Sequence, residues 1–466
     1  MAEKQHTSSD KPKFRIPAYA ETALELIEDA GFEAWLVGGF VRDAILGRKL
    51  CDVDIATNAL WQDVDRIFRE KGYRTHETGT KHGTLTVIVD EFPLEITTYR
   101  SDGKYSDGRH PDTVHFAQSI EEDLKRRDFT INALAYHPQR GLYDPYGGYA
   151  DIQAHIIRTV GKAEDRFAED GLRILRACRF CSQLGFDFEE ATYNSMVYCK
   201  GMLLKMPAER ITHELELFLL GDHTHFALMR CVDVLSIILP ELVAMKDFDQ
   251  RTPYHIYDVL EHSAYAVQNT PPELLIRLAA LFHDCGKPAS FFTDRSGQGH
   301  FYGHPLVSMR IAQASLDHLT LPSALKEEVL LLVRHHDDIV NPNTKAVKRM
   351  LHRLGDNPDL FRALCELKRA DALSQAPQCA GRVELADNLE KILDEILDAE
   401  EAFTLSKLAI KGDDVIALGV TRGPAVGKAL EAALDAVIDE TLANDKKALC
   451  DFVGAWWQDN KDKFAS

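Results

Sequence analysis

Residues 36–57, LVGGFVRDAILGRKLCDVDIAT, constrain the fold more than any other stretch of this chain. The pattern predicts a strand that ends at Gly38-Gly39, then a helix, then a second strand. Glycines at a strand-to-helix turn let backbone N–H groups approach phosphate oxygens, at a helix N-terminus that favours anions. Asp52 and Asp54 lie two residues apart on the second strand, so their carboxylates point to the same face.

The two carboxylates of this DxD pair repel one another unless a divalent cation neutralises them. Phosphoryl transfer uses that arrangement, because Mg²⁺ activates the attacking hydroxyl and stabilises the leaving pyrophosphate. Glu95, in LEITTYR on a later strand, is a candidate third carboxylate, with an exposed strand residue as the competing explanation. A Gly-Gly turn or a DxD alone is weak evidence, but both in this order and spacing predict a Mg²⁺-dependent transferase site.

The composition is that of an ordinary soluble protein, with 466 residues, 45% hydrophobic and 27% charged. No apolar run approaches the roughly 20 residues that span a bilayer, and the polar N-terminus resembles no signal peptide. Nine scattered cysteines suit reduced thiols, and Cys178 and Cys181 are best explained as packed helix residues. We therefore expect a cytoplasmic protein without membrane contact. The net charge of −19 argues against nonspecific coating of nucleic acid, yet permits a local basic site.

Hydrophobic periodicity predicts an α+β chain whose mixed sheet lies in the N-terminal part and whose remainder is all-α. Residues 1–15 are expected to be disordered, and Pro240 marks a break between helical segments. The predicted domains are a sheet domain at 16–148 and three helical parts at 149–245, 250–376 and 385–466.

Four further motifs follow the DxD in order: RRDFTINALAY (126–136), DPYGGYADIQAHIIRTVG (144–161), EDGLRILRACRF (169–180) and ERITHEL (209–215). Together with residues 36–57 the set resembles the class II tRNA nucleotidyltransferases, the family of bacterial CCA-adding enzymes and poly(A) polymerases. The resemblance implies a nucleotidyltransferase head at 16–148, a neck and body, and a tRNA-binding tail at 385–466. It also implies nucleotide-binding roles for Gly38, Gly39, Arg42, Arg127, Asp128, Asn132, Asp170, Arg173, Arg176 and Arg179.

Base selection can also be argued from the chemistry of the EDxxRxxR run. Asp170 and Arg173 lie three apart, so we expect them to be neighbours on one helix face, which Arg176 and Arg179 continue. A carboxylate accepts from an exocyclic amine and a guanidinium donates to a ring nitrogen or carbonyl. Cytosine and adenine satisfy this pair, whereas uracil and guanine leave mismatched polar groups. The competing explanation is an ordinary salt bridge between the two residues.

Residues 100–116, RSDGKYSDGRHPDTVHF, are rich in Gly, Asp and Ser and predict a mobile loop. The loop resembles the flexible segment that family members able to add the terminal A retain and that CC-only relatives lack. Arg109 is the candidate switch residue in it.

A second constellation lies at 250–376, where His262, the His283-Asp284 pair and Asp371 follow one another in the order H…HD…D. The order resembles the HD phosphohydrolase superfamily, whose imidazole and carboxylate ligands suit a divalent transition metal that activates water for phosphoester hydrolysis. Lys287 follows in the HDxGK pattern, and additional candidate ligands are His304, His335 and His336. Such domains also occur as scaffolds, so both an active and a structural role stay open.

The sequence thus predicts an enzyme that adds C, C and A to the 3′ end of tRNA from CTP and ATP, with a second, HD-type centre. An A-adding enzyme or poly(A) polymerase is the first alternative. The others are an HD metallophosphohydrolase acting on RNA ends or nucleotides, and a noncatalytic RNA-binding protein. The oligomeric state is not predicted.

Overall fold

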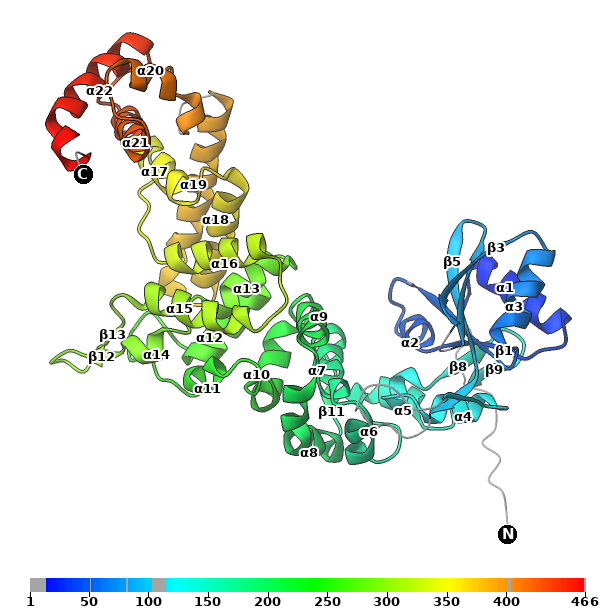
Figure 1. Cartoon of the computed structure of the whole chain (residues 1–466). Coiled ribbons are helices and arrows are strands. Elements are labelled where there is room, and N and C mark those ends of the chain that lie inside the picture. Colours follow the sequence, from blue (N-terminus) through cyan, green and yellow to red (C-terminus); the bar gives the residue numbers. More distant parts are fainter. Residues whose placement is uncertain (1–13, 51, 81–82, 103–113, 400–403, 465–466) are drawn as a thin grey trace. The chain divides into compact units, whose positions relative to one another are not determined.

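The computed structural model describes residues 14–50, 52–80, 83–102, 114–399 and 404–464. It forms two compact units that divide between Ile238 and Leu239, beside the predicted break at Pro240. The first unit contains the mixed sheet and the second is almost entirely helical (Figure 1), which confirms the predicted α+β class. The short helix at Glu241–Met245 belongs to the second unit, so the predicted 149–245 segment crosses the boundary. The finer division into four domains stays a prediction.

The described part of the first unit contains a seven-stranded sheet in the order β3-β4-β5-β2-β1-β8-β9. Its inner strands β2 and β5 run parallel, and its other neighbours are antiparallel. The strands are β1 (Ala34–Val37), β2 (Val53–Thr57), β3 (Arg74–Gly79), β4 (Thr84–Val89), β5 (Phe92–Thr98), β8 (Ala135–His137) and β9 (Gly141–Tyr143). Within the motif RRDFTINALAY, Thr130–Asn132 forms a 3-10 helix, and β8 begins only at Ala135.

Side chains alternate between the two faces of β2. Val53 and Ile55 are buried on one face, and Asp54 and Ala56 point to the other. Ala56 lies in a buried cluster with Trp35 and with Leu124 of α4 (Ile120–Lys125). Helices α1 (Ala18–Asp29) and α3 (Trp61–Glu70) pack against β4 (Figure 1). The alternation thus places the carboxylate of Asp54 opposite the face that buries Val53 and Ile55.

Helices complete the first unit after Gly147, which adopts φ +76°. They are α5 (Gly148–Ala154), α6 (Ala163–Glu169), α7 (Leu172–Leu184), α8 (Glu190–Cys199), α9 (Ala208–Leu219) and α10 (Thr224–Leu235), with two-residue strands β10 (Ile156–Ile157) and β11 (Asp187–Phe188). Helix α7 packs against both α9 and α10. Cys178 and Cys181 are buried free thiols of α7, as predicted.

The second unit begins with α11 (Glu241–Met245) and continues with the helices that carry the histidine pattern. They are α12 (Val259–Asn269), α13 (Leu274–Phe282), α14 (Lys287–Ser290), α15 (His304–Asp317), α16 (Ser323–His335), α17 (Thr344–Arg353), α18 (Pro358–Leu373) and α19 (Gly381–Asp398). Helix α13 packs against α12, α16 and α18, which brings distant histidines together. A short hairpin, β12 (Phe292–Thr293) and β13 (Gly299–His300), precedes α15.

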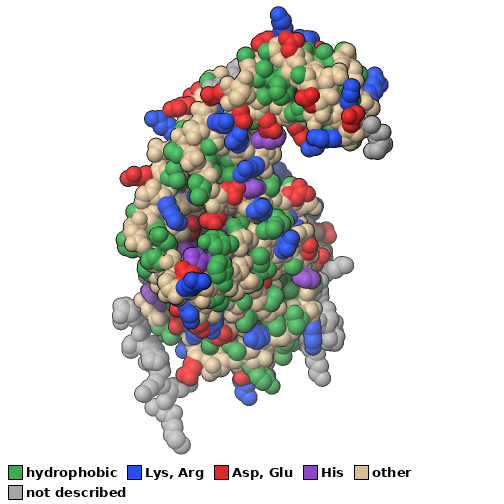
Figure 2. Space-filling model, turned by 90° about the vertical axis from the view of Figure 1, so that its left-hand side faces the viewer, with side chains coloured by type: hydrophobic (Ala, Val, Ile, Leu, Met, Phe, Trp, Pro, Cys, Tyr) green, Lys and Arg blue, Asp and Glu red, His purple; other side chains and the backbone are tan. Residues whose placement is uncertain are grey.

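The C-terminal helices α20 (Gly412–Ala417), α21 (Pro424–Ile438) and α22 (Lys446–Asn460) share a separate apolar core around Leu434, Val453 and Trp457. On the face of the molecule drawn in Figure 2, Lys and Arg side chains are interspersed with Asp and Glu. Among the described residues, no helix is both long enough and apolar enough to cross a membrane.

Candidate nucleotidyl-transfer site and metal centre

The predicted strand–turn–helix is present, with β1 leading through Gly38 into α2 (Gly39–Ile45). Gly38 adopts φ 72° and ψ −137°, a backbone conformation that residues with a Cβ rarely adopt. A Cβ at this position would also lie 2.9 Å from Nη1 of Arg127. The sequence therefore needs glycine here both for the turn and for the approach of an arginine.

The predicted carboxylates meet at the inner strands of the sheet. Asp54 of β2 is aligned with Glu95 of the parallel neighbour β5, so the two side chains share a face, and Asp52 is exposed just before β2. Burial, together with the charges of Glu95 and Asp52 and against the opposing charge of Arg127, raises the pKa of Asp54 to about 6. Oxygen donors in mutual repulsion are the ligands that Mg²⁺ prefers, so the set fits the predicted cation.

Arg42 and Arg176 are joined through polar side chains of the motif RRDFTINALAY (126–136). Nη1 of Arg42 donates to Oδ1 of Asn132 (2.7 Å), and Nε of Arg176 donates to Oδ2 of Asp128 (2.7 Å). The amide of Asn132 reaches Oδ1 of Asp128 at 3.5 Å. Although burial raises the pKa of Asp128, the charges of Arg176 and Arg173 and two hydrogen bonds lower it to about 2. The predicted nucleotide-binding residues are thus brought together, with Asp128 ionised.

The predicted helix-face pairing of Asp170 with Arg173 is wrong. Asp170 is the C-cap of α6 in an extended conformation (φ −147°, ψ 107°), and its Oδ1 accepts from the backbone N–H of Leu172. Its carboxylate pairs with Nη2 of Arg210 on α9 at 2.7 Å, whereas Arg173 pairs with Glu169. The sequence spacing assumed a continuous helix, but the chain breaks at Asp170, as Ser, Asp and Asn side chains tend to cause.

Arg176 and Arg179 follow Arg173 along α7, and all three line one pocket, as their three-residue spacing predicted. Nη1 of Arg179 lies 3.2 Å from Oε2 of Glu214, a largely buried carboxylate of α9. The guanidinium groups of Arg176 and Arg179 lie over the ring of Phe180, with Cζ 5.7 Å and 4.6 Å from the ring centroid. These cation–π contacts position the two groups and leave their charge available to a ligand.

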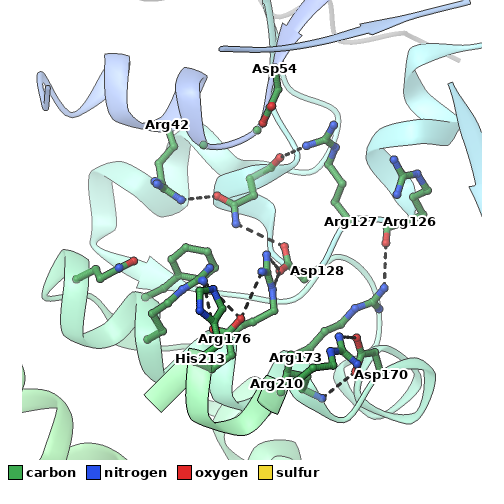
Figure 3. Close-up of a pocket in the computed structure, with 18 of the residues that line it drawn as sticks. Arg42, Asp54, Arg126, Arg127, Asp128, Asp170, Arg173, Arg176, Arg210 and His213 are labelled. Atoms are coloured by element: carbon green, nitrogen blue, oxygen red, sulfur yellow. Dashed lines mark hydrogen bonds and ion pairs between the residues drawn. The ribbon is translucent and has the colours of Figure 1, made fainter. Parts of the chain in front are cut away.

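These side chains surround a pocket of about 1000 Å³ that lies wholly within the first unit (Figure 3). Eight arginines and five carboxylates line it, so the pocket is locally basic in an acidic chain. Asp54 is part of its wall, whereas Asp52 and Glu95 are not among its described lining residues. Sequence reasoning did not assign the lining residues Arg100, Arg126, Phe180, Gln183, Glu209, Arg210, His213 and Glu214. For Arg210 and His213 the only signal was their position in the ERITHEL motif.

The predicted loop is paired at its two ends. Strands β6 (Arg100–Asp102) and β7 (Val114–Phe116) form an antiparallel ribbon with Arg100 aligned with Phe116. Arg109 lies outside the described residues, so its predicted switching role stays a prediction.

The second constellation assembles in the second unit. His262 of α12, His283 at the end of α13, the adjacent Asp284 and Asp371 of α18 have one ligand atom each within 4.8 Å of one another. Nε2 of His262 lies 3.0 Å from Oδ1 of Asp371 and 3.3 Å from Oδ2 of Asp284, and Nε2 of His283 lies 3.1 Å from the latter atom. Burial opposes protonation of His283, but the two carboxylates raise its pKa to about 10. The four predicted ligands form a buried cluster whose carboxylates attract a cation.

Asp284 also belongs to a second group, with His304 and His336. Its Oδ1 lies 3.2 Å from Nε2 of His304 and 3.6 Å from Nε2 of His336. One carboxylate therefore faces two sets of imidazoles with its two oxygens. His335 instead pairs with Asp338 at 2.8 Å and is not part of either group.

All four histidines of these groups present Nε2 to the cluster because Nδ1 is engaged elsewhere. The Nδ1 atoms contact backbone carbonyls of Ser374, Ala280, Phe301 and Val333, at 3.1, 2.7, 3.0 and 2.8 Å for His262, His283, His304 and His336. Such contacts select the tautomer whose Nε2 lone pair binds metal. Nitrogen and oxygen donors together suit a divalent transition metal, so the residues fit the predicted ion.

Comparisons with known proteins identify the family of the chain. Residues 34–158 match the family model "Poly A polymerase head domain", residues 185–246 the "Probable RNA and SrmB- binding site of polymerase A", and residues 315–453 the "tRNA nucleotidyltransferase domain 2 putative". A CCA-adding enzyme of Geobacillus kaustophilus is 34% identical over 434 residues, which are 92% of this chain and 95% of that protein. The chain belongs to the CCA-adding enzyme family.

Other members of the CCA-adding enzyme family are also similar to this chain over nearly its whole length. The enzyme of Lactiplantibacillus plantarum is 33% identical over 94% of this chain and 97% of its own length. The crystal structure of the Bacillus stearothermophilus CCA-adding enzyme in complex with CTP superposes with a TM-score of 0.70 and 29% identity, covering 96% of this chain and 98% of that one. These findings confirm that the chain is a nucleotidyltransferase, and the enzymes of its family need a divalent metal. The HD-type assignment rests on the cluster geometry alone and stays a prediction.

Proposed function

We propose that this chain adds C, C and A to the 3′ end of tRNA, using CTP and ATP without a nucleic-acid template. The observation that carries the proposal is the basic pocket whose wall holds Asp54, aligned with Glu95 on a parallel strand, beside the Gly38 turn. The substrate is inferred from the family, since relatives that match along nearly the whole chain are CCA-adding enzymes. Cytoplasmic action and the four-domain division remain part of this proposal.

Asp52, Asp54 and Glu95 would hold Mg²⁺, which supplies activation of the tRNA 3′-hydroxyl and stabilisation of the departing pyrophosphate. The turn at Gly38-Gly39 presents backbone N–H groups at the N-terminus of α2, where phosphate oxygens are favoured. Arginines of α7 and of the motif RRDFTINALAY would neutralise the triphosphate. The side chains of Asn132 and Asp128 would offer acceptors to the ribose hydroxyls.

Asp170 and Arg173 would read the Watson–Crick edge of the incoming base. Both line the pocket, although each is paired with another residue, Asp170 with Arg210 and Arg173 with Glu169. We infer that Arg210 orients the Asp170 carboxylate and leaves one face of it for an exocyclic amine. A carboxylate oriented in this way accepts hydrogen bonds, so that the exocyclic amines of C and A fit and the carbonyls of U and G do not.

The alternative within the family is addition of A alone. Uptake of C distinguishes the two, because an A-adding enzyme or poly(A) polymerase leaves tRNA without its CC untouched or extends it with A. Labelled CTP offered alone to tRNA lacking its 3′ CCA should therefore be incorporated by this chain.

The catalytic assignment is tested by Asp54→Asn, which keeps the volume of the side chain and removes the charge. Incorporation of both CMP and AMP should be abolished, while tRNA affinity stays nearly unchanged because the carboxylate serves chemistry rather than docking. Asp63→Asn is the matched control, since Asp63 forms a surface pair with Arg66 on α3. Turnover by Asp54→Asn within about twofold of the control contradicts the assignment.

A second activity is supported by the cluster of the second unit. We propose that His262, His283, Asp284 and Asp371 hold a divalent transition metal, with His304 and His336 completing a second ligand set that shares Asp284. Such an ion would activate water toward a phosphomonoester or a 2′,3′-cyclic phosphate at an RNA end. Lys287 donates to Asp284 at 2.6 Å and to Oε1 of Gln250 at 2.9 Å, which fixes the shared carboxylate.

The double variant His283→Ala, Asp284→Ala should lose hydrolysis of these substrates and leave nucleotide addition intact. Metal content, measured on the purified protein after loading with Mn²⁺, should fall in parallel. Equal loss of addition and hydrolysis would mean that the cluster is a structural part of the transferase.

A further inference from the structure

An exposed stack of aromatic rings stands at the pocket of the second unit's metal cluster. The cross-strand pair of the hairpin, Phe292 and His300, stacks with centroids 5.3 Å apart, and Tyr302 stacks on His300 at 5.5 Å with an interplanar angle of 21°. Tyr302 is 76% exposed and Phe292 45%. Because folding leaves most of the Tyr302 ring in water, its burial contributes little to stability.

The stack is held in place by its own turn. Nε2 of His300 lies 3.0 Å from Oδ2 of Asp294, whose Oδ1 accepts from the backbone N–H groups of Ser296 and Gln298 at 2.8 and 3.1 Å. The side chain of Asp294 therefore closes the turn and orients the middle ring at once. Tyr302 thus stacks on a ring that the side chain of Asp294 contacts.

The stack and the cluster belong to one pocket. His300 and Tyr302 line a cavity of about 390 Å³, together with the proposed ligands Asp284, His304 and Asp371. Tyr302 also precedes His304 by two residues, and the backbone carbonyl of Phe301, the residue just before Tyr302, contacts Nδ1 of His304. The stacked ring and the proposed ligand therefore lie close together along the chain.

A positively charged side chain, that of Arg382, lines the same pocket. Arg382 is exposed, and its Nη1 donates to Oε1 of Gln375 (2.8 Å), whose Nε2 in turn donates to Oδ1 of Asp371 (2.9 Å). The chain of contacts ties a guanidinium to a proposed ligand and leaves its other N–H groups for an anion. The pocket therefore offers an aromatic face, an arginine and the cluster, within the usual size of small-molecule sites, about 300–1,000 Å³.

We propose that this pocket binds a nucleotide, free or as the 3′-terminal residue of an RNA, with its base on Tyr302 and its phosphate between Arg382 and the cluster. Stacking accepts any base, since every base has a π-face, so the site selects nucleotides over base-free phosphate esters without selecting sequence. The inference rests on the proposed hydrolase activity of the same cluster and assigns the groups that recognise its substrate.

The test compares Tyr302→Ala with Tyr302→Phe, which keeps the ring, and with Tyr198→Ala, which removes another exposed tyrosine, in the first unit. With Mn²⁺-loaded protein, Tyr302→Ala should raise KM for 2′,3′-cyclic AMP about tenfold, a typical loss for one base–aromatic stack, and leave kcat nearly unchanged. Tyr302→Phe and Tyr198→Ala should behave as wild type. Glycerol 2-phosphate, which has no base, should show the same KM in all four proteins.

Binding is measured separately from turnover, so that a failed stack and a failed hydrolase give different results. Adenosine 2′-monophosphate should protect the segment 291–304 of the wild-type protein from hydrogen–deuterium exchange, and Tyr302→Ala should require about tenfold more ligand for the same protection. Protection without hydrolysis of any ester supports the stack and contradicts the hydrolase. An unchanged KM and unchanged protection in Tyr302→Ala overturn the proposal, as does an equal loss for glycerol 2-phosphate.

Discussion

The substitution Asp128→Asn tests whether the buried charge pair beneath the nucleotide pocket stabilises the first unit. The pKa of Asp128 is lowered from 3.8 to about 2, and each pKa unit corresponds to about 1.36 kcal/mol. Removing its charge should therefore cost about 2.5 kcal/mol. Breaking a fully buried ion pair costs more, roughly 3–5 kcal/mol. The side chain of Arg176 is 33% exposed, however, and Glu214 lies nearby, so we expect the cost of about 2.5 kcal/mol derived from the pKa shift.

The effect of Asp128→Asn should depend on pH with a definite sign. The pKa of Asp128 is lower in the folded chain than in the unfolded one, so ionisation favours folding. The contribution is fully present above about pH 4 and is lost as the pH falls toward 2. Wild type and variant should therefore differ most at neutral pH and converge as the solution is acidified.

Urea unfolding of the full chain, followed by pulsed hydrogen exchange of peptides from residues 128–184, measures the first unit separately from the second. Asp63→Asn is again the control, because exposed pairs contribute only about 0–1 kcal/mol. A destabilisation by Asp128→Asn no larger than that of the control, or a difference that grows on acidification, would refute the reasoning.

Two further predictions concern the choice of nucleotide. Asp170→Ala or Arg173→Ala should erode the preference for CTP and ATP over UTP and GTP about ten- to hundredfold, and equal slowing with all four nucleotides would exclude base reading. Shortening residues 102–110, or Arg109→Ala, should impair addition of A far more than addition of C, and sequencing of the 3′ ends should show tRNA ending in CC; full CCA ends would exclude the switching role.

Local patterns predicted the parts of the site that lie within one element or one turn. The Gly38 turn and the carboxylate of Asp54 follow from a strand–turn–helix–strand pattern, since period-2 alternation fixes the face of each side chain. The alignment of Glu95 with Asp54 needed the pairing of β2 with β5, which spacing does not encode. For this reason Glu95 was predicted only as a candidate.

Contacts between distant segments were not predictable in the same way. Arg210 pairs with Asp170 across 40 residues because α9 packs on α7, and the assumed neighbour of Asp170 was wrong because the helix breaks there. Residue order indicated the candidate residues of the second cluster, yet which of His335 and His336 faces it depended on where α16 ends. Adjacent residues point in different directions, so a one-residue difference decides which histidine joins the cluster.

The most direct test of the central claim is the sequence of tRNA 3′ ends after incubation of transcripts that lack CCA. With CTP alone the ends should gain CC, with ATP alone they should gain nothing, and with both nucleotides they should end in CCA without further residues. Addition of A directly to ends that lack CC, or failure to incorporate C under any condition, would contradict the account.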